Sequence, residues 1–238
     1  MLHINEVYPS IQGEGVFAGE PTIFVRTQGC SLRCVWCDTP YGLPFGEKAT
    51  EIGEGEFHTP LQVLDRVILA SEGKAYHHVC LTGGDPLQQN NVSLLAFLKL
   101  AVQAGFTITI ETGGHIPTVK YIELAKEFGR IYLCVDYKLP CSGMNEKMKS
   151  SAFSTLREED SIKFVVGSKD DFDEAMLFLD HQRENKVKAL ALFSPVWDSE
   201  LSVRELANLV MKLPKFFAPA RLSLQLHKLI WEPATRAV

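Results

Sequence analysis

The chain has 238 residues, of which 46% are hydrophobic and 22% charged, and its formal net charge is −5. These values are ordinary for a globular protein, and the length fits one domain spanning residues 1–238. Basic residues do not cluster and no apolar run is long enough for a bilayer, so neither a nucleic-acid nor a membrane partner is expected. Six cysteines in a chain that opens without a signal sequence favour reduced thiols and a cytoplasmic location.

Taken in chain order, short β-rich runs alternate with longer helical patterns. Strands are expected at 22–28, 77–84, 106–114, 130–138, 161–167 and 188–196, with a further candidate at 221–228. Helices are expected between them, at 59–73, 91–105, 117–129, 170–184 and 200–213. The segments 42–58 and 140–155 have the composition of loops. This alternation predicts an α/β fold with a mostly parallel sheet, and about six or seven strands favour a partial, open parallel β/α barrel over a closed one.

Four unusual stretches follow strands at one edge of the predicted sheet. GCSLRCVWCDT (29–39) follows the first strand, TGGDP (82–86) the second and ETGG (111–114) the third, while DYK (136–138) ends the fourth. Sites in parallel α/β sheets form at the carboxyl ends of the strands. The four stretches are therefore expected to converge on one site.

The first stretch holds Cys30, Cys34 and Cys37 in the spacing C-x3-C-x2-C. Structural zinc normally takes four protein ligands, often as two separated pairs. A [4Fe–4S] cube has four irons and usually thiolate ligands, so three cysteines leave one iron open to a substrate or cofactor. Cys80 and Cys134 lie in apolar strands and are interpreted as core residues. A structural or zinc role for the three clustered cysteines remains the alternative.

The spacing, together with Trp36 before the third cysteine, resembles the signature of the radical S-adenosylmethionine (SAM) superfamily. In that superfamily the open iron binds the amino and carboxylate groups of SAM, whose reductive cleavage gives a 5′-deoxyadenosyl radical. TGGDP looks like the superfamily's glycine-rich motif, with Asp85 where glutamate is commoner. The resemblance implies that the backbone at Gly84 meets the methionine ammonium, because glycine permits a close approach.

A narrower resemblance covers nearly the whole chain. SIQGEG (10–15), FVRTQGC (24–30), WCDT (36–39), FSPVWD (193–198) and LSLQLHKLIW (222–231) are similar to the 7-carboxy-7-deazaguanine synthase family. That family has a shortened, modified radical SAM barrel and is usually a homodimer. Membership implies a lyase that converts 6-carboxy-5,6,7,8-tetrahydropterin to 7-carboxy-7-deazaguanine by hydrogen abstraction at C6, ring contraction and loss of ammonia. The product feeds queuosine and other deazapurines. An external electron donor such as flavodoxin or ferredoxin, and Mg²⁺, would assist.

The resemblance also implies roles for individual residues, none of them an acid–base catalyst. The expected substrate contacts are Ile11, Gln12, Gly13, Arg26, Thr82 and the C-terminal Val238. Arg26 suits the substrate carboxylate, since guanidinium binds it bidentately. The expected cofactor contacts are Trp36, Cys37, Asp38, Gly84, Asp136, Tyr137, Lys138, Ser194, Pro195, Val196 and Trp197. The expected metal ligands are Cys30, Cys34 and Cys37 for iron and Thr39 for magnesium.

Several alternatives stay open from the sequence. Arg26 could form a surface ion pair, the Thr82 hydroxyl could bond local backbone, Thr39 could cap the turn at Pro40, and His227 could be structural rather than bind substrate. The whole chain could instead be an activase that makes a glycyl radical in a partner protein. Such an activase would not need SIQGEG or Arg26. A third possibility is a non-catalytic iron–sulfur or zinc protein, which SAM cleavage after reduction would exclude.

Overall fold

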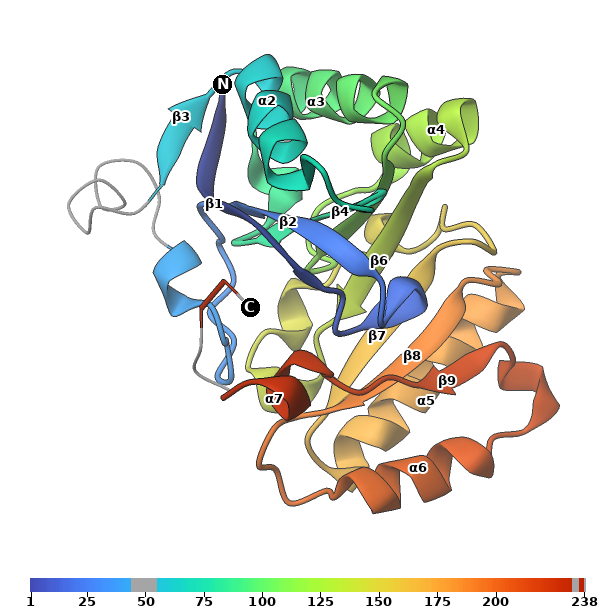
Figure 1. The fold of residues 1–238 in the computed structure, drawn as a ribbon. Helices are drawn as coiled ribbons and strands as arrows, with labels where there is room; N and C mark the ends of the chain where they lie inside the picture. The colour runs from blue at the N-terminus through green and yellow to red at the C-terminus, as the bar shows by residue number, and fades with distance from the viewer. Residues whose placement is uncertain (44–54, 233–235, 238) are drawn as a thin grey trace.

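The computed structural model describes residues 1–43, 55–232 and 236–237 (Figure 1). Within this part of the chain the strands form one nine-stranded sheet in the order β3-β1-β2-β4-β5-β6-β7-β8-β9. Their bounds are Leu2–Ile11 (β1), Pro21–Thr27 (β2), Glu56–His58 (β3), His78–Gly83 (β4), Thr107–Thr112 (β5), Ile131–Tyr137 (β6), Ser161–Val166 (β7), Leu190–Pro195 (β8) and Ala220–Leu222 (β9). From β2 to β9 neighbouring strands are parallel, whereas β1 pairs antiparallel with both β2 and β3.

Five helices follow the outer face of this curved sheet (Figure 1). They are Pro60–Ser71 (α2), Asn91–Gln103 (α3), Val119–Phe128 (α4), Lys169–Glu184 (α5) and Val203–Met211 (α6). The short helix His227–Ile230 (α7) lies near the end of the described chain and is not part of this layer. Single 3-10 turns include Gly15–Phe17 (η1), Pro40–Gly42 (η2), Pro86–Gln88 (η3) and Pro140–Ser142 (η4). The edge strands β3 and β9 do not pair with each other, so the predicted open α/β barrel is confirmed. None of the described helices combines the length and apolarity that crossing a bilayer requires.

The helix ends follow from local chemistry that the sequence displays. Thr59 accepts a hydrogen bond from Gln62 N while the Gln62 side chain bonds the Thr59 N–H, which is a complete capping box before α2. Helix α4 stops at Gly129, whose φ of 67° is left-handed and therefore favours glycine. These two predicted boundaries agree with the structure to within two residues.

Two strands were not predicted, and one prediction was too long. The sequence Leu2–Ile11 contains charged and polar residues, but it is held as β1 by antiparallel pairing with β2. Glu56–His58 lies in the segment predicted as a loop, yet it pairs with the start of β1. The candidate strand 221–228 leaves the sheet after Ser223, whose N–H bonds Phe193 O. This departure brings the following residues back over the sheet.

The main core lies between the sheet and the helices. One side of the strands between the two edges of the sheet contributes fully buried aliphatic residues, such as Ile23, Val79, Ile108 and Ile162, which join Phe97 of α3 in one cluster. Because side chains alternate along a strand, the intervening residues face the other side of the sheet. That second side carries the polar residues described below.

His78 bridges three strands at the amino end of the sheet. Its ring nitrogens contact the Thr22 hydroxyl at 2.7 Å and the Thr109 hydroxyl at 2.8 Å, and the residue is only 1% exposed. Burial lowers the pKa of His78 from 6.5 to about 4. Between these values the unfolded chain binds more protons than the folded chain. The stabilisation present above pH 6.5 is therefore lost as the pH falls towards 4.

We expect His78→Gln to remove this part of the pH dependence. Between pH 7.5 and 4.5 the free energy of unfolding of the wild type should fall by roughly 2–3 kcal/mol more than that of the variant. Urea unfolding of both proteins at the two pH values measures the difference. Equal losses in the two proteins would show that His78 does not titrate as its burial requires.

Candidate active site

A cavity of about 620 Å³ opens at the carboxyl ends of the parallel strands. Its wall includes residues from β1, β2 and β4 to β7, the segment 30–43, here named the cysteine loop, and the C-terminal residues 225–228 and 236–237. The volume lies in the range of sites that hold small molecules. The convergence of the four stretches at one edge of the sheet is thus seen in the structure: Cys30, Gly84, Glu111 and Asp136 all line this cavity.

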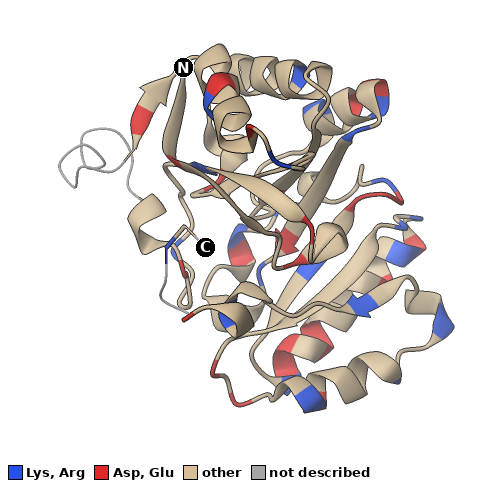
Figure 2. Ribbon diagram, in the orientation of Figure 1, with Lys and Arg blue, Asp and Glu red and all other residues tan. Residues whose placement is uncertain are grey.

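The strands present polar side chains to the cavity at matching positions. Arg26 of β2 is paired in register with Thr82 of β4, and Asp136 of β6 with Lys163 of β7. Glu111 of β5 lies between these two pairs. Figure 2 shows acidic and basic positions next to one another on the central strands. The inner side of the barrel is therefore polar at its carboxyl end, where the cavity lies.

Cys30, Cys34 and Cys37 are free and all line the cavity. Burial, and then the charge of Asp85, raises the pKa of the Cys30 thiol to about 12; burial likewise raises the pKa of Cys34. Among the described residues, no three His, Cys, Asp or Glu side chains converge where a single metal ion could be held. The three thiols interact in sequence, Cys30 with Cys34 and Cys34 with Cys37. Separate but adjacent thiols fit a polynuclear cluster, whose irons each take one thiolate and compensate its charge.

The TGGDP stretch is hydrogen-bonded to residues 27–29, which lead into the cysteine loop. Gly84 N donates to Thr27 O and Asp85 N donates to Gly29 O, both at 2.9 Å. A Cβ on residue 84 would lie 2.4 Å from Gly29 O, so only glycine permits this approach. Gly84 therefore lines the cavity and also packs against the cysteine loop.

The Asp85 side chain connects the loop that follows β4 to the loop that follows β5. It accepts hydrogen bonds from the Thr112 hydroxyl, Gly113 N and Leu87 N, each at 2.9 Å. The residue is 1% exposed, and burial raises its pKa despite these donors. Gly113 in turn leaves room for Leu32 of the cysteine loop, because a Cβ there would lie 2.7 Å from Leu32 Cδ1.

A chain of charges crosses the floor of the cavity. Lys163 Nζ lies 3.0 Å from Glu14 Oε2 and 3.9 Å from Asp136 Oδ2, and Lys138 Nζ donates to Asp136 Oδ2 at 2.7 Å. Burial alone would raise the pKa of Glu14, but Lys163 and the Gln225 amide lower it to about 2. The Asp136 Oδ1 atom is buried without a hydrogen-bond partner. An unpartnered carboxylate oxygen beside the thiols is suited to a donor on a bound cofactor.

A second polar group surrounds Glu111. Its carboxylate accepts from the Thr82 hydroxyl at 3.0 Å and from Gln12 Nε2 at 3.3 Å. Thr82 thus bonds a side chain rather than local backbone. His227 also lines the cavity and packs on the backbone at Gly13, where a Cβ would lie 2.3 Å from its Nδ1.

Arg26 lines the cavity and is not a surface residue. Its Nε donates to Glu6 Oε1 and its Nη2 to the Tyr8 hydroxyl, each at 2.7 Å. Burial disfavours the charge, yet Tyr8, Tyr41 and Glu6 raise the pKa of Arg26 above its ordinary value. Because two of its nitrogens already donate to protein groups, the fully bidentate contact expected with a ligand is reduced to the remaining donors.

The other expected site residues fall into three groups. Ile11, Trp36, Asp38, Thr39, Lys138, Val196 and Trp197 line the cavity. The Thr39 hydroxyl does not cap η2; it lies 3.8 Å from Cys37 Sγ. Gly13, Tyr137, Ser194 and Pro195 are not among the lining residues. The Tyr137 side chain faces the helices, where its hydroxyl bonds Glu174 of α5 and its ring stacks on Phe178. Val238 lies outside the described residues.

The cavity also contains residues that the sequence analysis did not assign. They include Glu111 and Lys163, and also Glu14, which accepts hydrogen bonds from Lys163 and Gln225. Their signal was present in the sequence: Lys163 is a lone charge within the apolar strand SIKFVV, and Glu111 is the penultimate residue of the strand TITIET. A charged residue inside an otherwise buried strand needs a partner or a function.

Comparison with known proteins agrees with this geometry. The family model of the radical SAM superfamily matches residues 24–200. The 7-carboxy-7-deazaguanine synthase of Koribacter versatilis (strain Ellin345) is 34% identical over 249 aligned positions that cover 100% of both chains. The enzyme of the same name from Thermoplasma acidophilum (strain ATCC 25905) is also 34% identical, over 96% of each chain.

A solved structure of the same family is also similar to this chain. The crystal structure of QueE from Escherichia coli superposes with a TM-score of 0.72 and 26% sequence identity, covering 94% of this chain and 93% of that one. The resemblance noted in the sequence is thereby confirmed over the full length of the chain. The chain belongs to the 7-carboxy-7-deazaguanine synthase family of the radical SAM superfamily.

Proposed function

We propose that this protein is a 7-carboxy-7-deazaguanine synthase, a lyase that contracts the ring of 6-carboxy-5,6,7,8-tetrahydropterin with loss of ammonia. The observation that carries the proposal is one cavity lined both by the three cysteines and by the hydrogen-bonding residues of the N-terminal motif. A cluster site alone would fit many radical enzymes. The second wall, with Gln12, Arg26 and Glu111, supplies the polar groups that a pterin requires.

Cys30, Cys34 and Cys37 would hold three irons of a [4Fe–4S] cluster, and SAM would bind at the fourth. When bound, this pair supplies the one-electron chemistry that removes a hydrogen atom from the substrate. Asp136 would accept a hydrogen bond from the cofactor through its unpartnered Oδ1, while Lys138 holds its other oxygen. Trp36, Asp38, Gly84, Val196 and Trp197 would form the remaining wall around the cofactor.

The substrate would bind towards β1, β2 and β5. The amino and amide N–H groups of a pterin can donate to the Glu111 carboxylate, which Gln12 and Thr82 hold in place. Backbone groups of Ile11 to Gly13 would bond the ring edge. Arg26 would contact the substrate carboxylate with the donors that Glu6 and Tyr8 leave. Val238 would close this side, since residues 236 and 237 line the cavity.

A magnesium ion would link the enzyme to the substrate through Thr39. The Thr39 hydroxyl lines the cavity, is not used for capping, and lies next to Cys37. Magnesium usually keeps waters and substrate oxygens as most of its ligands, so one protein oxygen suffices. The ion would orient the carboxylate and stabilise charge during ring contraction.

We also propose a domain organisation, a cellular location and partners for the enzyme. We place the enzyme in the cytoplasm as a single domain, 1–238, because its described cysteines are all free and its described strands share one sheet. It would act as a homodimer and receive electrons from flavodoxin or ferredoxin.

The cluster assignment is tested by replacing the cysteines one at a time. Cys30→Ala, Cys34→Ala or Cys37→Ala should each abolish iron–sulfur absorption and the formation of 5′-deoxyadenosine. Cys80→Ala is the matched control, because Cys80 is fully buried and does not line the cavity. Iron content after anaerobic reconstitution is the measurement. Similar iron loss from all four variants would refute the assignment.

Arg26 tests the substrate pose. Arg26→Ala should weaken substrate binding by roughly 2–4 kcal/mol, because a charge-assisted hydrogen bond to the carboxylate is lost. Arg26→Lys should be nearly as harmful, since one ammonium cannot serve Glu6, Tyr8 and the substrate together. The apparent KM of each variant for the pterin measures the effect. Unchanged affinity in Arg26→Ala would disprove the contact.

Thr39 tests the magnesium site. We expect Mg²⁺ to stimulate wild-type turnover, Thr39→Ala to lose most of that stimulation, and Thr39→Ser to retain it. All three proteins should keep the cluster and should cleave SAM when no pterin is present. This control separates ion binding from cluster assembly. A full magnesium response in Thr39→Ala would place the ion elsewhere.

A further inference from the structure

Both neighbours of Cys30 are bonded to one short segment, residues 85–88. On one side, Gly29 O accepts from Asp85 N at 2.9 Å. On the other side, Gln88 Oε1 accepts from Ser31 N at 2.9 Å, and Gln88 Nε2 donates to the Ser31 hydroxyl at 2.5 Å. The backbone that carries the first cysteine is therefore held on both sides of Cα.

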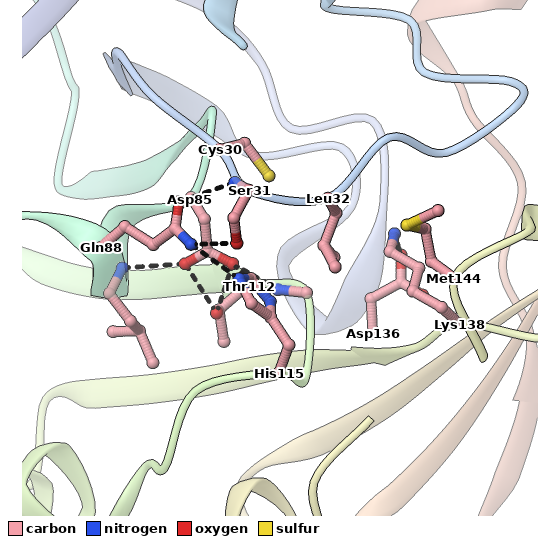
Figure 3. A network of polar contacts seen from close by, with 12 residues as sticks. Cys30, Ser31, Leu32, Asp85, Gln88, Thr112, His115, Asp136, Lys138 and Met144 are labelled. Carbon is pink, nitrogen blue, oxygen red and sulfur yellow. Dashed lines mark hydrogen bonds and ion pairs between the residues drawn. The ribbon is translucent and has the colours of Figure 1, made fainter. Parts of the chain in front are cut away.

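His115 fixes the direction in which the Gln88 amide points. The second hydrogen of Gln88 Nε2 is directed at His115 Nε2, at 2.9 Å. With both hydrogens used, the amide oxygen is left facing Ser31 N–H. His115 is itself buried, and its Nδ1 lies 3.6 Å from Asp85 Oδ2. Figure 3 shows Ser31, Gln88, His115 and Asp85 lying together. His115 therefore connects the Gln88 amide to the surroundings of Asp85, whose N–H bonds Gly29 O on the other side of Cys30.

Cys34 and Cys37 are held differently. Val35, one neighbour of Cys34, donates its N–H to Ser142 O, and the other neighbour, Arg33, donates its N–H to Met144 Sδ at 3.2 Å. Cys37 N donates to Cys34 O within the loop itself. Ser31, beside Cys30, is instead held by two hydrogen bonds with a single side-chain amide, a pair here named the Gln88 clamp. Cys30 is also the most buried of the three thiols.

We propose that Gln88 and His115 are positioning residues for Cys30 and that they control how firmly the cluster is retained. The inference rests on the proposed function only in requiring a cluster on the three cysteines. Groups that orient a ligand from outside the coordination sphere tune both the affinity of a metal site and its electronic properties. Without the Gln88 clamp, Ser31 keeps no described side-chain partner, and the Cys30 thiolate is free to turn away from its iron.

The test is the rate at which reconstituted protein loses iron to a ferrous chelator under anaerobic conditions. Gln88→Leu removes the amide oxygen and nitrogen but keeps a side chain of similar size. We expect this variant to lose iron on the order of tenfold faster than the wild type. Gln88→Glu keeps an acceptor for Ser31 N–H and should stay within about threefold of the wild type. Gln103→Leu is the control, since Gln103 is an exposed residue at the end of α3.

Two further readouts separate positioning from general stability. The electron paramagnetic resonance spectrum of the reduced cluster should change in Gln88→Leu and in His115→Phe. Thermal unfolding of the iron-free proteins should differ little from that of the wild type, because the clamp ties one loop and not the core.

The outcomes are distinct. Iron loss and spectra that match the wild type in Gln88→Leu would overturn the inference, and so would faster loss that simply follows a large drop in the unfolding temperature of the iron-free chain. A wild-type protein that holds a cluster but does not convert the pterin would overturn the proposed function and leave this inference standing. A wild-type protein that holds no cluster would overturn both.

Discussion

The architecture of the site depends on the buried carboxylate of Asp85. Asp85 follows the end of β4, and its carboxylate accepts hydrogen bonds from Thr112 and Gly113 at the end of β5. The backbone N–H of Asp85 donates to the carbonyl of Gly29, which precedes the cysteine loop. Three loops from different parts of the sequence are thereby fixed relative to one another. Burial of a carboxylate costs free energy unless hydrogen-bond donors surround it, and loss of these donors would leave that cost uncompensated. The arrangement therefore favours one loop geometry over alternatives.

The charged residues on the inner side of the barrel also depend on nearby partners. Lys163 lies between Glu14 and Asp136, so the charges of these three side chains compensate one another. Because the pKa of Glu14 is held near 2, its carboxylate stays ionised at any physiological pH. The ring of a pterin is uncharged and forms hydrogen bonds, so it can lie beside these charges without disturbing their balance, while the substrate carboxylate has its proposed contact at Arg26. In the proposed site, a donor of the bound cofactor would supply the partner that Asp136 Oδ1 lacks.

The sequence predicted what depends on periodicity and on motif spacing, and it missed what depends on pairing. The parallel strands, the capped helices and the convergence of the cysteines with Gly84 followed from local pattern. The strand β1 did not, because antiparallel pairing with β2 stabilises it despite its polar residues. Contacts across the cavity, such as Glu111 with Gln12, join residues about a hundred positions apart and leave only weak local signals. The side of the strand on which Tyr137 lies was likewise decided by packing on Phe178.

The central claim is that cofactor and pterin share one cavity, close enough for direct transfer of a hydrogen atom. The most direct measurement uses 6-carboxytetrahydropterin deuterated at C6, incubated anaerobically with reconstituted enzyme, SAM, Mg²⁺ and a reductant, followed by mass spectrometry. We predict 7-carboxy-7-deazaguanine together with 5′-deoxyadenosine that carries deuterium. Formation of 5′-deoxyadenosine without deuterium and without the deazaguanine product would show that the cavity does not bring the two molecules together, and would contradict the account.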